Sequence, residues 1–225
     1  MNSAYEQYGI LVVPDILTLD QVIAFRTTLD IYLNDFNSYK ECNISRIIPD
    51  FAGNTPQLGA LNSLHQNELV NEILKNQIFP NKNFIYANHS DLHQNKTTGW
   101  HRDTYDYLLE DRGNGNPKDL WSEECHIIKV CFLLQDHINN DYGLWFQPGT
   151  HKSEIQSTPI HIKTKSTDMI IFNQRILHSG QTKSPKYHEV FNENRYLITY
   201  AYGLDNKHTK IHTLGATKRQ SKQKV

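Results

Sequence analysis

Cysteine and methionine are scarce in this sequence. Among 225 residues there are three cysteines (Cys42, Cys125 and Cys131) and two methionines, and no two cysteines have the C-x-x-C spacing of a zinc or redox site. A small, odd number of cysteines argues against a disulfide framework, which is typical of oxidising compartments. We therefore expect a cytoplasmic protein with reduced thiols.

Long hydrophobic runs and an excess of either charge are also absent. No stretch approaches the roughly 18 apolar residues of a membrane-spanning helix, and residues 1–15 lack the basic start and apolar run of a signal peptide. The 23 basic and 24 acidic residues give a net charge of -1, so the chain has no electrostatic footprint for nucleic acid or an anionic membrane. We expect a small-molecule substrate, no nucleic acid and no membrane partner, and we leave the oligomeric state open.

The length and the 38% hydrophobic content predict one domain over residues 1–225. Residues 1–80 are interpreted as an N-terminal strand, helices and a candidate lid, and residues 81–205 as a β-rich core. Residues 206–225 form a polar tail without an apolar face, which we expect to be frayed and solvated.

The N-terminal part predicts a strand at residues 9–13, ended by Pro14. Thr18 is then placed to cap a helix whose apolar residues recur at helical spacing from Val22 to Leu33. Residues 36–61 carry few periodic apolar positions and are interpreted as an irregular segment, followed by a second helix over residues 66–76.

Short β-rich runs dominate after residue 80. They are bounded by Gly, Pro, Asn or Asp and cover residues 84–87, 127–134, 143–146, 169–172 and 196–202. So many short strands in the last two-thirds of a chain predict an antiparallel double sheet or barrel. The fold class is therefore mainly β with flanking helices.

A histidine and a carboxylate, His101 and Asp103, stand two residues apart, so on a strand they point to one face. A second histidine, His178, follows a later β-rich run. Two imidazoles and one carboxylate on one side of a metal leave three octahedral positions open, the arrangement through which non-haem Fe(II) centres admit a co-substrate and O₂. We predict that His101, Asp103 and His178 are the metal ligands and carry the catalysis.

Two basic residues are candidates for binding a co-substrate carboxylate. Arg195 begins the last β-rich run, and a guanidinium grips a carboxylate through two parallel hydrogen bonds. Lys129 lies within a strand expected to face the core, where a lysine needs a partner. It either faces the same co-substrate or points outward from the other face of the sheet.

Several stretches resemble the phytanoyl-CoA dioxygenase family of Fe(II)- and 2-oxoglutarate-dependent oxygenases, which includes the ectoine hydroxylases. Trp100-His101-Arg102-Asp103 resembles the family's W-H-x-D motif. Residues 133–151, which end in Pro-Gly-Thr-His, resemble its "D…NG.L…PGSH" segment, and residues 9–22 are similar to its opening strand and helix.

This resemblance implies a double-stranded β-helix (jelly-roll or cupin-like) core with N-terminal helices. It implies that His101, Asp103 and His178 bind Fe(II) and that Arg195 binds 2-oxoglutarate, with O₂ as the other co-substrate. The spacing between His178 and Arg195 is longer than usual in the family, so residues 183–194 are interpreted as an insertion. The implied reaction is hydroxylation of a small metabolite, an amino acid or a natural-product intermediate, with release of succinate and CO₂. An intact Asp103 favours hydroxylation over halogenation.

Two other functions remain open from the sequence. One is a non-catalytic jelly-roll binding protein. The other is a cupin-type metalloenzyme with Zn²⁺, Mn²⁺ or Ni²⁺ that does not use 2-oxoglutarate, and such an enzyme would not need Arg195 to bind a co-substrate.

Other aromatic and histidine residues have less specific predictions. Structural roles are expected for His89, His93, His126 and His151, and a place at the substrate pocket is considered for Tyr105, Tyr107 and Trp121.

Overall fold

The computed structural model describes residues 2–35, 45–109, 115–180 and 186–223. Its strands are β1 (Ile10–Val13), β2 (Arg46–Pro49), β3 (Phe84–Gln94), β4 (Ile127–Leu133), β5 (Trp145–Gln147), β6 (Ile160–His161), β7 (Met169–Asn173), β8 (Leu177–Ser179) and β9 (Tyr196–Leu204). Its helical segments are α1 (Ser3–Tyr8), α2 (Leu19–Asp35), the 3₁₀-helical η1 (Pro56–Gln66), α3 (Glu68–Ile73), the π-helical η2 (Leu74–Ile78), α4 (Tyr105–Leu108), the 3₁₀-helical η3 (Asp119–Trp121), α6 (Tyr187–Phe191) and α7 (Lys207–Gln223).

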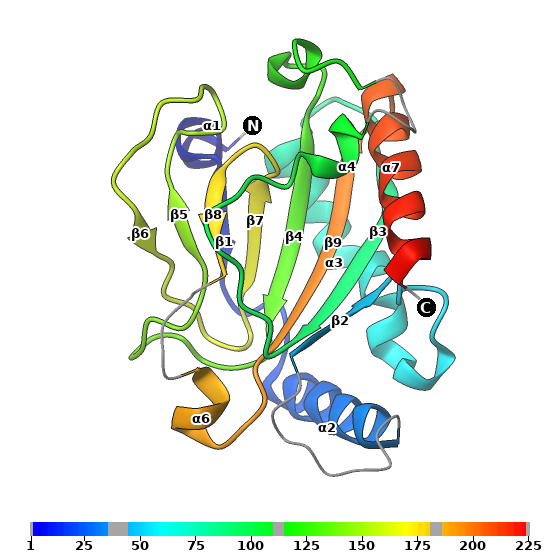
Figure 1. Ribbon diagram of the computed structural model, residues 1–225, viewed down its shortest axis with the longest axis vertical. Coiled ribbons are helices and arrows are strands. Elements are labelled where there is room, and N and C mark those ends of the chain that lie inside the picture. The colour runs from blue at the N-terminus through cyan, green and yellow to red at the C-terminus, as the bar shows by residue number, and fades with distance from the viewer. Residues whose placement is uncertain (1, 36–44, 110–114, 181–185, 224–225) are drawn as a thin grey trace.

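The strands form two antiparallel sheets (Figure 1). The larger sheet has the order β1-β7-β4-β9-β3-β2 and the smaller one β6-β5-β8. Phe146 of β5 packs edge-on against Phe172 of β7, with ring centroids 5.1 Å apart, so the two sheets share an apolar layer. The mainly β fold with an antiparallel double sheet, predicted from the sequence, is confirmed.

Strand β4 illustrates why the large sheet is buried on both faces. Side chains alternate along a strand, so Val130 and Phe132 point to one face and Cys131 and Leu133 to the other. The first pair belongs to a core cluster shared with α2, η1 and α3, and the second pair to the cluster between the two sheets. All seven residues of β4 are buried as a result.

The N-terminal elements follow the predicted pattern. The Thr18 hydroxyl accepts a hydrogen bond from the Gln21 backbone at 3.2 Å, and the Gln21 side chain accepts one from the Thr18 backbone at 2.8 Å. This reciprocal pair is a capping box, which sets the start of α2. Helix α1, which the sequence pattern did not predict, precedes β1 and is capped by the Asn2 side chain.

The interpretation of residues 36–61 as irregular is wrong for the part that the structure describes. Residues 46–49 form β2, which pairs with the end of β3, and η1 begins at Pro56. The buried leucines of η1, Leu58, Leu61 and Leu64, recur every three residues. Only Leu61 and Leu64 share one uninterrupted turn of 3₁₀-helix, because the backbone of Gly59 is not helical; a search for α-helical spacing misses so short and broken a segment. Residues 36–44, including Cys42 and part of the candidate lid, lie outside the described residues.

The expectation of a frayed tail over residues 206–225 is also wrong where the structure describes it. Residues 207–223 form α7, which lies beside β3 and α4 (Figure 1). The face of α7 that packs inward is made of polar and small residues, namely His208, Thr209, His212, Gly215, Ala216 and Gln220. Its contacts are therefore hydrogen bonds and close backbone approaches, which a search for apolar periodicity does not detect. None of the helices in the described residues is long and apolar enough to cross a membrane.

Gly9 offers a test of how closely the N-terminus packs on the small sheet. Its φ is +78°, and a Cβ there would lie 2.4 Å from Nδ1 of His151. Gly53 has a φ of +76°, but a Cβ there would meet no atom within 4 Å, so it is a matched control. Gly53→Ala should cost about 1–2 kcal/mol of unfolding free energy from the left-handed backbone alone, and Gly9→Ala about 1–3 kcal/mol more from overpacking. Urea unfolding of both variants measures this difference, and equal losses would contradict the packing described.

Candidate metal centre

His101, Asp103 and His178 come together where the segment before α4 meets β8 of the smaller sheet. A backbone bridge joins His101 to His178, with N–H···O distances of 2.9 and 3.0 Å in the two directions. Nε2 of His101 lies 3.4 Å and Nε2 of His178 lies 3.7 Å from the Asp103 carboxylate. One ligand atom from each residue lies within 4.8 Å of the others, which fits a single metal ion. The structure therefore brings together the three residues that the sequence pattern selected.

The second nitrogen of each imidazole contacts a backbone carbonyl. Nδ1 of His101 lies 2.7 Å from the Gly99 oxygen, and Nδ1 of His178 lies 3.1 Å from the Ile176 oxygen. A carbonyl can only accept, so each Nδ1 carries a proton, and Nε2 is the nitrogen of each imidazole that remains to bind a metal. This orientation by backbone acceptors is typical of histidine ligands to metals.

The charges of the triad also suit a cation. Burial would raise the pKa of Asp103, but His178, Lys129 and the hydrogen bond from His101 hold it well below its usual range. Burial lowers the pKa of His178 to about 4 despite the nearby Asp103 charge. At neutral pH the site therefore presents an ionised carboxylate and a neutral buried imidazole, which are the forms that bind metal.

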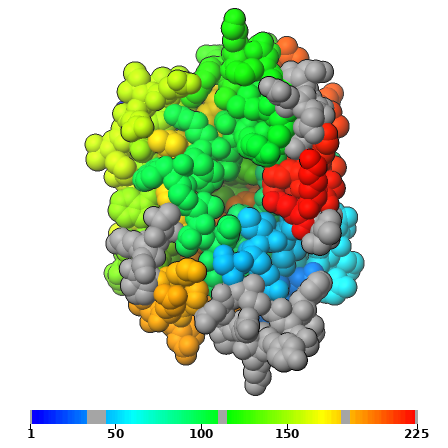
Figure 2. Space-filling model, viewed as in Figure 1, coloured from blue at the N-terminus to red at the C-terminus, as the bar shows by residue number. Residues whose placement is uncertain are grey.

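The triad opens into a cavity of about 240 Å³. Figure 2 shows the hollow between the C-terminal helix, in red, and the green atoms of the middle of the chain. One part of the wall is apolar, with Cys131, Leu144, Phe172 and Leu197, and the rest carries charged and polar groups. Tyr105 lines the cavity as considered from the sequence, whereas Tyr107 is fully buried and Trp121 packs against the Arg102 guanidinium.

Arg195 lines this cavity and is only 2% exposed. Its Nε donates to the Tyr142 oxygen and its Nη1 to the Lys96 oxygen, each at 3.1 Å, while Nη2 has no hydrogen-bond partner among the described residues. Burial lowers the pKa of Arg195 to about 10, so it stays charged at neutral pH. A buried guanidinium held by neutral carbonyls, with one arm unbonded, is suited to an anionic ligand.

Lys129 also faces the cavity and is 4% exposed, so the outward orientation considered from the sequence is wrong. Its Nζ lies 2.9 and 3.1 Å from the two ring nitrogens of His89. The cavity thus has two buried cationic side chains, both of which the sequence pattern had selected.

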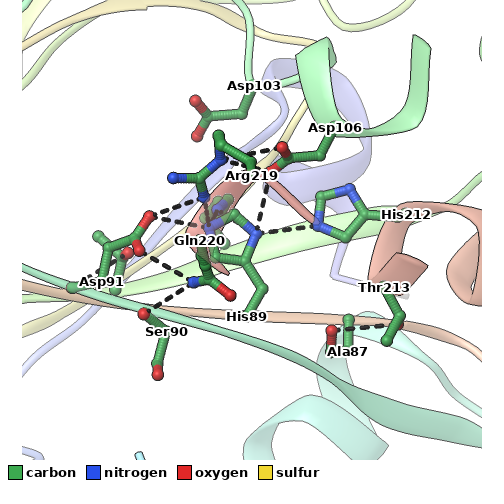
Figure 3. A network of polar contacts seen from close by, with 12 residues as sticks. Ala87, His89, Ser90, Asp91, Asp103, Asp106, His212, Thr213, Arg219 and Gln220 are labelled. Carbon is green, nitrogen blue, oxygen red and sulfur yellow. Dashed lines mark hydrogen bonds and ion pairs between the residues drawn. The ribbon is translucent and has the colours of Figure 1, made fainter. Parts of the chain in front are cut away.

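The sequence pattern missed a polar network whose residues His89, Asp91, Asp106 and Arg219 also line the cavity (Figure 3). His89 lies 3.0 Å from the Asp91 carboxylate and 3.1 Å from Nε2 of His212. Arg219 reaches from α7 to Asp91 at 3.1 Å and to Asp106 at 2.9 Å. The helical spacing of polar residues in α7 is the only trace of this network in the sequence.

The described residues contain a second histidine and carboxylate cluster, His89, Asp106 and His212. It does not fit a metal ion, because cations already occupy its ligand atoms. Nζ of Lys129 lies 3.1 Å from Nδ1 of His89, and Nε of Arg219 lies 2.9 Å from Asp106. A divalent ion there would be placed against both positive charges.

The other histidines behave largely as expected. His126 contacts the Tyr5 hydroxyl at 2.9 Å, and Nε2 of His151 lies 3.2 Å from the Glu6 oxygen, so both join the N-terminal segment to the core. His89 belongs to the network described above, and His93 lines the cavity. None of these four is a member of the His101 triad.

No family model matches the sequence, and no curated protein matches it. Solved structures, in contrast, do match this chain. HygX from Streptomyces hygroscopicus, with nickel and 2-oxoglutarate bound, is 16% identical over 88% of this chain and 84% of its own, with a TM-score of 0.63. The non-heme alpha ketoglutarate-dependent epimerase SnoN from nogalamycin biosynthesis is 15% identical, covers 89% and 79%, and has a TM-score of 0.64. EctD from S. alaskensis, with 2-oxoglutarate and 5-hydroxyectoine, is 15% identical, covers 89% and 74%, and has a TM-score of 0.64.

These likenesses establish the fold. They confirm the jelly-roll architecture predicted from the sequence, and the presence of EctD among the neighbours agrees with the resemblance to a family that includes ectoine hydroxylases. At such identities they do not by themselves carry an activity over to this chain.

The geometry predicts one metal site per chain, at His101, Asp103 and His178. Titration with Co(II) should show about one bound ion, as expected for one facial triad. His178→Ala should lose this binding, since it removes one of three protein ligands. His212→Asn, in the second cluster, should keep the stoichiometry. Two ions in the wild-type protein, or undiminished binding by His178→Ala, would contradict the assignment.

Proposed function

We propose that the protein is an Fe(II)- and 2-oxoglutarate-dependent oxygenase that hydroxylates a small molecule. The observation that carries this proposal is the pairing, in one cavity, of the His101, Asp103 and His178 triad with the unbonded Nη2 of Arg195. A triad with open coordination positions suits non-haem Fe(II). An arginine without an anion partner in the same cavity supports a carboxylate-bearing co-substrate.

Each of these residues has a defined role in the proposal. His101, Asp103 and His178 hold the iron on one side, and Arg195 binds the distal carboxylate of 2-oxoglutarate. Iron and 2-oxoglutarate, when bound, supply the activation of O₂ that oxidises a C–H bond and releases succinate and CO₂. The remaining work of the protein is positioning and exclusion of water.

Other residues that line the cavity support the positioning of the reactants and the exclusion of water. Leu144, Phe172 and Leu197 form an apolar wall, and burial raises the pKa of the Cys131 thiol so that it stays protonated. Such a wall limits the water around a bound co-substrate and strengthens its interaction with Arg195. Lys129 adds a second positive charge at the cavity, which we assign a supporting role toward the co-substrate.

The substrate proposed is a small metabolite, an amino acid or a natural-product intermediate. The solved neighbours include HygX with hygromycin B bound, SnoN with nogalamycin RO bound and EctD with 5-hydroxyectoine bound. A cavity lined partly by Asp91, Asp106 and Arg219 supports a polar rather than a purely apolar molecule. Hydroxylation is the reaction proposed, although SnoN is an epimerase.

The activity is tested by succinate formation. Protein supplied with Fe(II), 2-oxoglutarate and O₂ should release succinate, and a substrate found in a panel of amino acids, osmolytes and glycosylated natural products should increase the rate. His178→Ala should lose turnover because the iron loses a ligand. Oxidation of a substrate without any requirement for 2-oxoglutarate would instead support a cupin-type metalloenzyme and contradict the proposal.

The role of Arg195 is tested by the affinity for 2-oxoglutarate. Arg195→Ala should cost roughly 2–5 kcal/mol of co-substrate binding, as expected when one partner of a buried charge pair is removed. This corresponds to a rise of about 30-fold or more in the dissociation constant. Arg195→Lys should recover only part of the loss, because an ammonium lacks the planar two-point grip.

Two controls sharpen this measurement. Iron binding should survive in Arg195→Ala, because the guanidinium is not a ligand. Lys129→Ala should weaken 2-oxoglutarate binding less than Arg195→Ala does. If the order of the two effects were reversed, Lys129 would be the carboxylate anchor and the assignment of Arg195 would be wrong.

A further inference from the structure

Helix α7 is attached to the segment that carries the metal ligand Asp103. Helix α4 begins two residues after Asp103, and two of its residues contact α7. The Tyr107 hydroxyl lies 2.9 Å from Nδ1 of His208. Gly215 lies so close to the Asp106 backbone that a Cβ would be 1.8 Å from its carbonyl oxygen. The C-terminal helix therefore packs directly on the continuation of the H-x-D motif.

Arg219 adds a third connection, through charge. Its Nε donates to both carboxylate oxygens of Asp106, at 2.9 and 3.2 Å, and its Nη2 donates to Asp91 of β3 at 3.1 Å (Figure 3). Its Nη1 donates to Gln223 at 2.7 Å. All three nitrogens of Arg219 are thus engaged within the protein, unlike those of Arg195. Because its donors are used within the protein, Arg219 is suited to join α7 to α4 and β3 rather than to bind a ligand.

The segment from His101 to Asp106 is consequently held from two sides. On one side the Asp103 N–H donates to the Gln174 oxygen at 2.9 Å, next to the bridge between His101 and His178. On the other side Arg219 ties Asp106 to Asp91 across the cavity wall. Asp103 itself is 26% exposed at its side chain, so its position depends on the backbone around it.

We propose that Arg219 is a positioning residue for the metal centre. By neutralising Asp91 and Asp106, it holds α4 against β3 and so fixes the backbone that presents Asp103 to the metal. Without the guanidinium, Asp106 would lose its ion pair with Arg219 while Asp91 would keep its contacts with His89 and Gln220, so α4 would move to hydrate Asp106. The inference rests on the proposed function only in that the triad must bind a metal ion.

The test compares Arg219→Gln with Lys222→Gln, which removes one exposed positive charge from the same helix. Co(II) is the probe, and its affinity and visible spectrum are measured on the full-length chain. Arg219→Gln should weaken Co(II) binding by about 10-fold, the lower end of the effect of residues that orient metal ligands, and should shift the spectrum. Lys222→Gln should change neither.

Two more variants separate positioning from general stability. Arg219→Lys keeps the positive charge but loses the guanidinium that contacts both carboxylates, so its Co(II) affinity should fall between those of the wild type and Arg219→Gln. This variant replaces Arg219→Gln in the test if Arg219→Gln does not fold. Asp106→Asn added to Arg219→Gln should restore part of the affinity, because the amide removes the carboxylate left without its cation. Unfolding midpoints measured on the same variants separate the two roles, because a Co(II) affinity that falls in fully folded protein is expected only if Arg219 positions Asp103.

The outcomes are distinguishable. A wild-type spectrum and affinity that persist in Arg219→Gln and Arg219→Lys, even with a lower unfolding midpoint, would overturn this inference and leave the proposed function intact. Absence of Co(II) binding in the wild type would overturn the proposed function, and this inference with it.

Discussion

The candidate site depends on one backbone pairing, the bridge between His101 and His178. Its two hydrogen bonds join the H-x-D segment to β8 of the smaller sheet. Main-chain groups that leave water must find partners, so this pairing is favoured whether or not a metal is present. The imidazoles are then turned by carbonyls of Gly99 and Ile176, two residues before each histidine. Local backbone therefore orients both imidazoles, and the rings of Phe146 and Phe172 pack against His178.

Two arginines that line one cavity, Arg195 and Arg219, show how hydrogen bonding separates structural from ligand-binding roles. Arg219 is satisfied by two carboxylates and an amide of the protein. Arg195 has carbonyl partners for two nitrogens and none, within the described chain, for the third. Burial alone does not distinguish them, because both are largely removed from water. The number of hydrogen-bond donors without a partner in the described chain distinguishes them.

Much of the fold and of the site is predictable because its signals are local. The β-rich runs have apolar faces, and the box at Thr18 and Gln21 marks the start of α2 within four residues. The spacing of His101 and Asp103 correctly predicted that they act together, although His101 forms only an isolated β-bridge and Asp103 lies in the turn that follows, rather than on one strand. His178 and Arg195 were selected because each lies next to a later β-rich run, and the resemblance to a family agreed with this choice; their distances from His101 could not be predicted, because no local pattern joins distant segments.

Helix α7 and strand β2, which escaped prediction, lack a clear apolar pattern. Helix α7 packs through polar and small residues, so its sequence has the composition of a solvated tail. The short strand β2 has only Ile47 and Ile48 as apolar residues and exists because the edge of β3 accepts it. The contacts of Arg219 with Asp91 and Asp106 join residues more than a hundred positions apart, and charged residues at that separation carry no spacing rule.

The place of β9 in the large sheet bears on how the protein is made. This strand, the last in the described chain, lies between β4 and β3, whose own neighbours on the far side are β7 and β2 (Figure 1). A nascent chain leaves the ribosome from its N-terminus, so β3 and β4 are synthesised before β9, the strand that pairs with both of them and ends at residue 204. During that time each presents an unpaired edge, and the non-local pairing that finally joins them is intrinsically slow. The large sheet, and the cavity wall that Arg195 and Leu197 contribute, are consequently completed only near the end of the described chain.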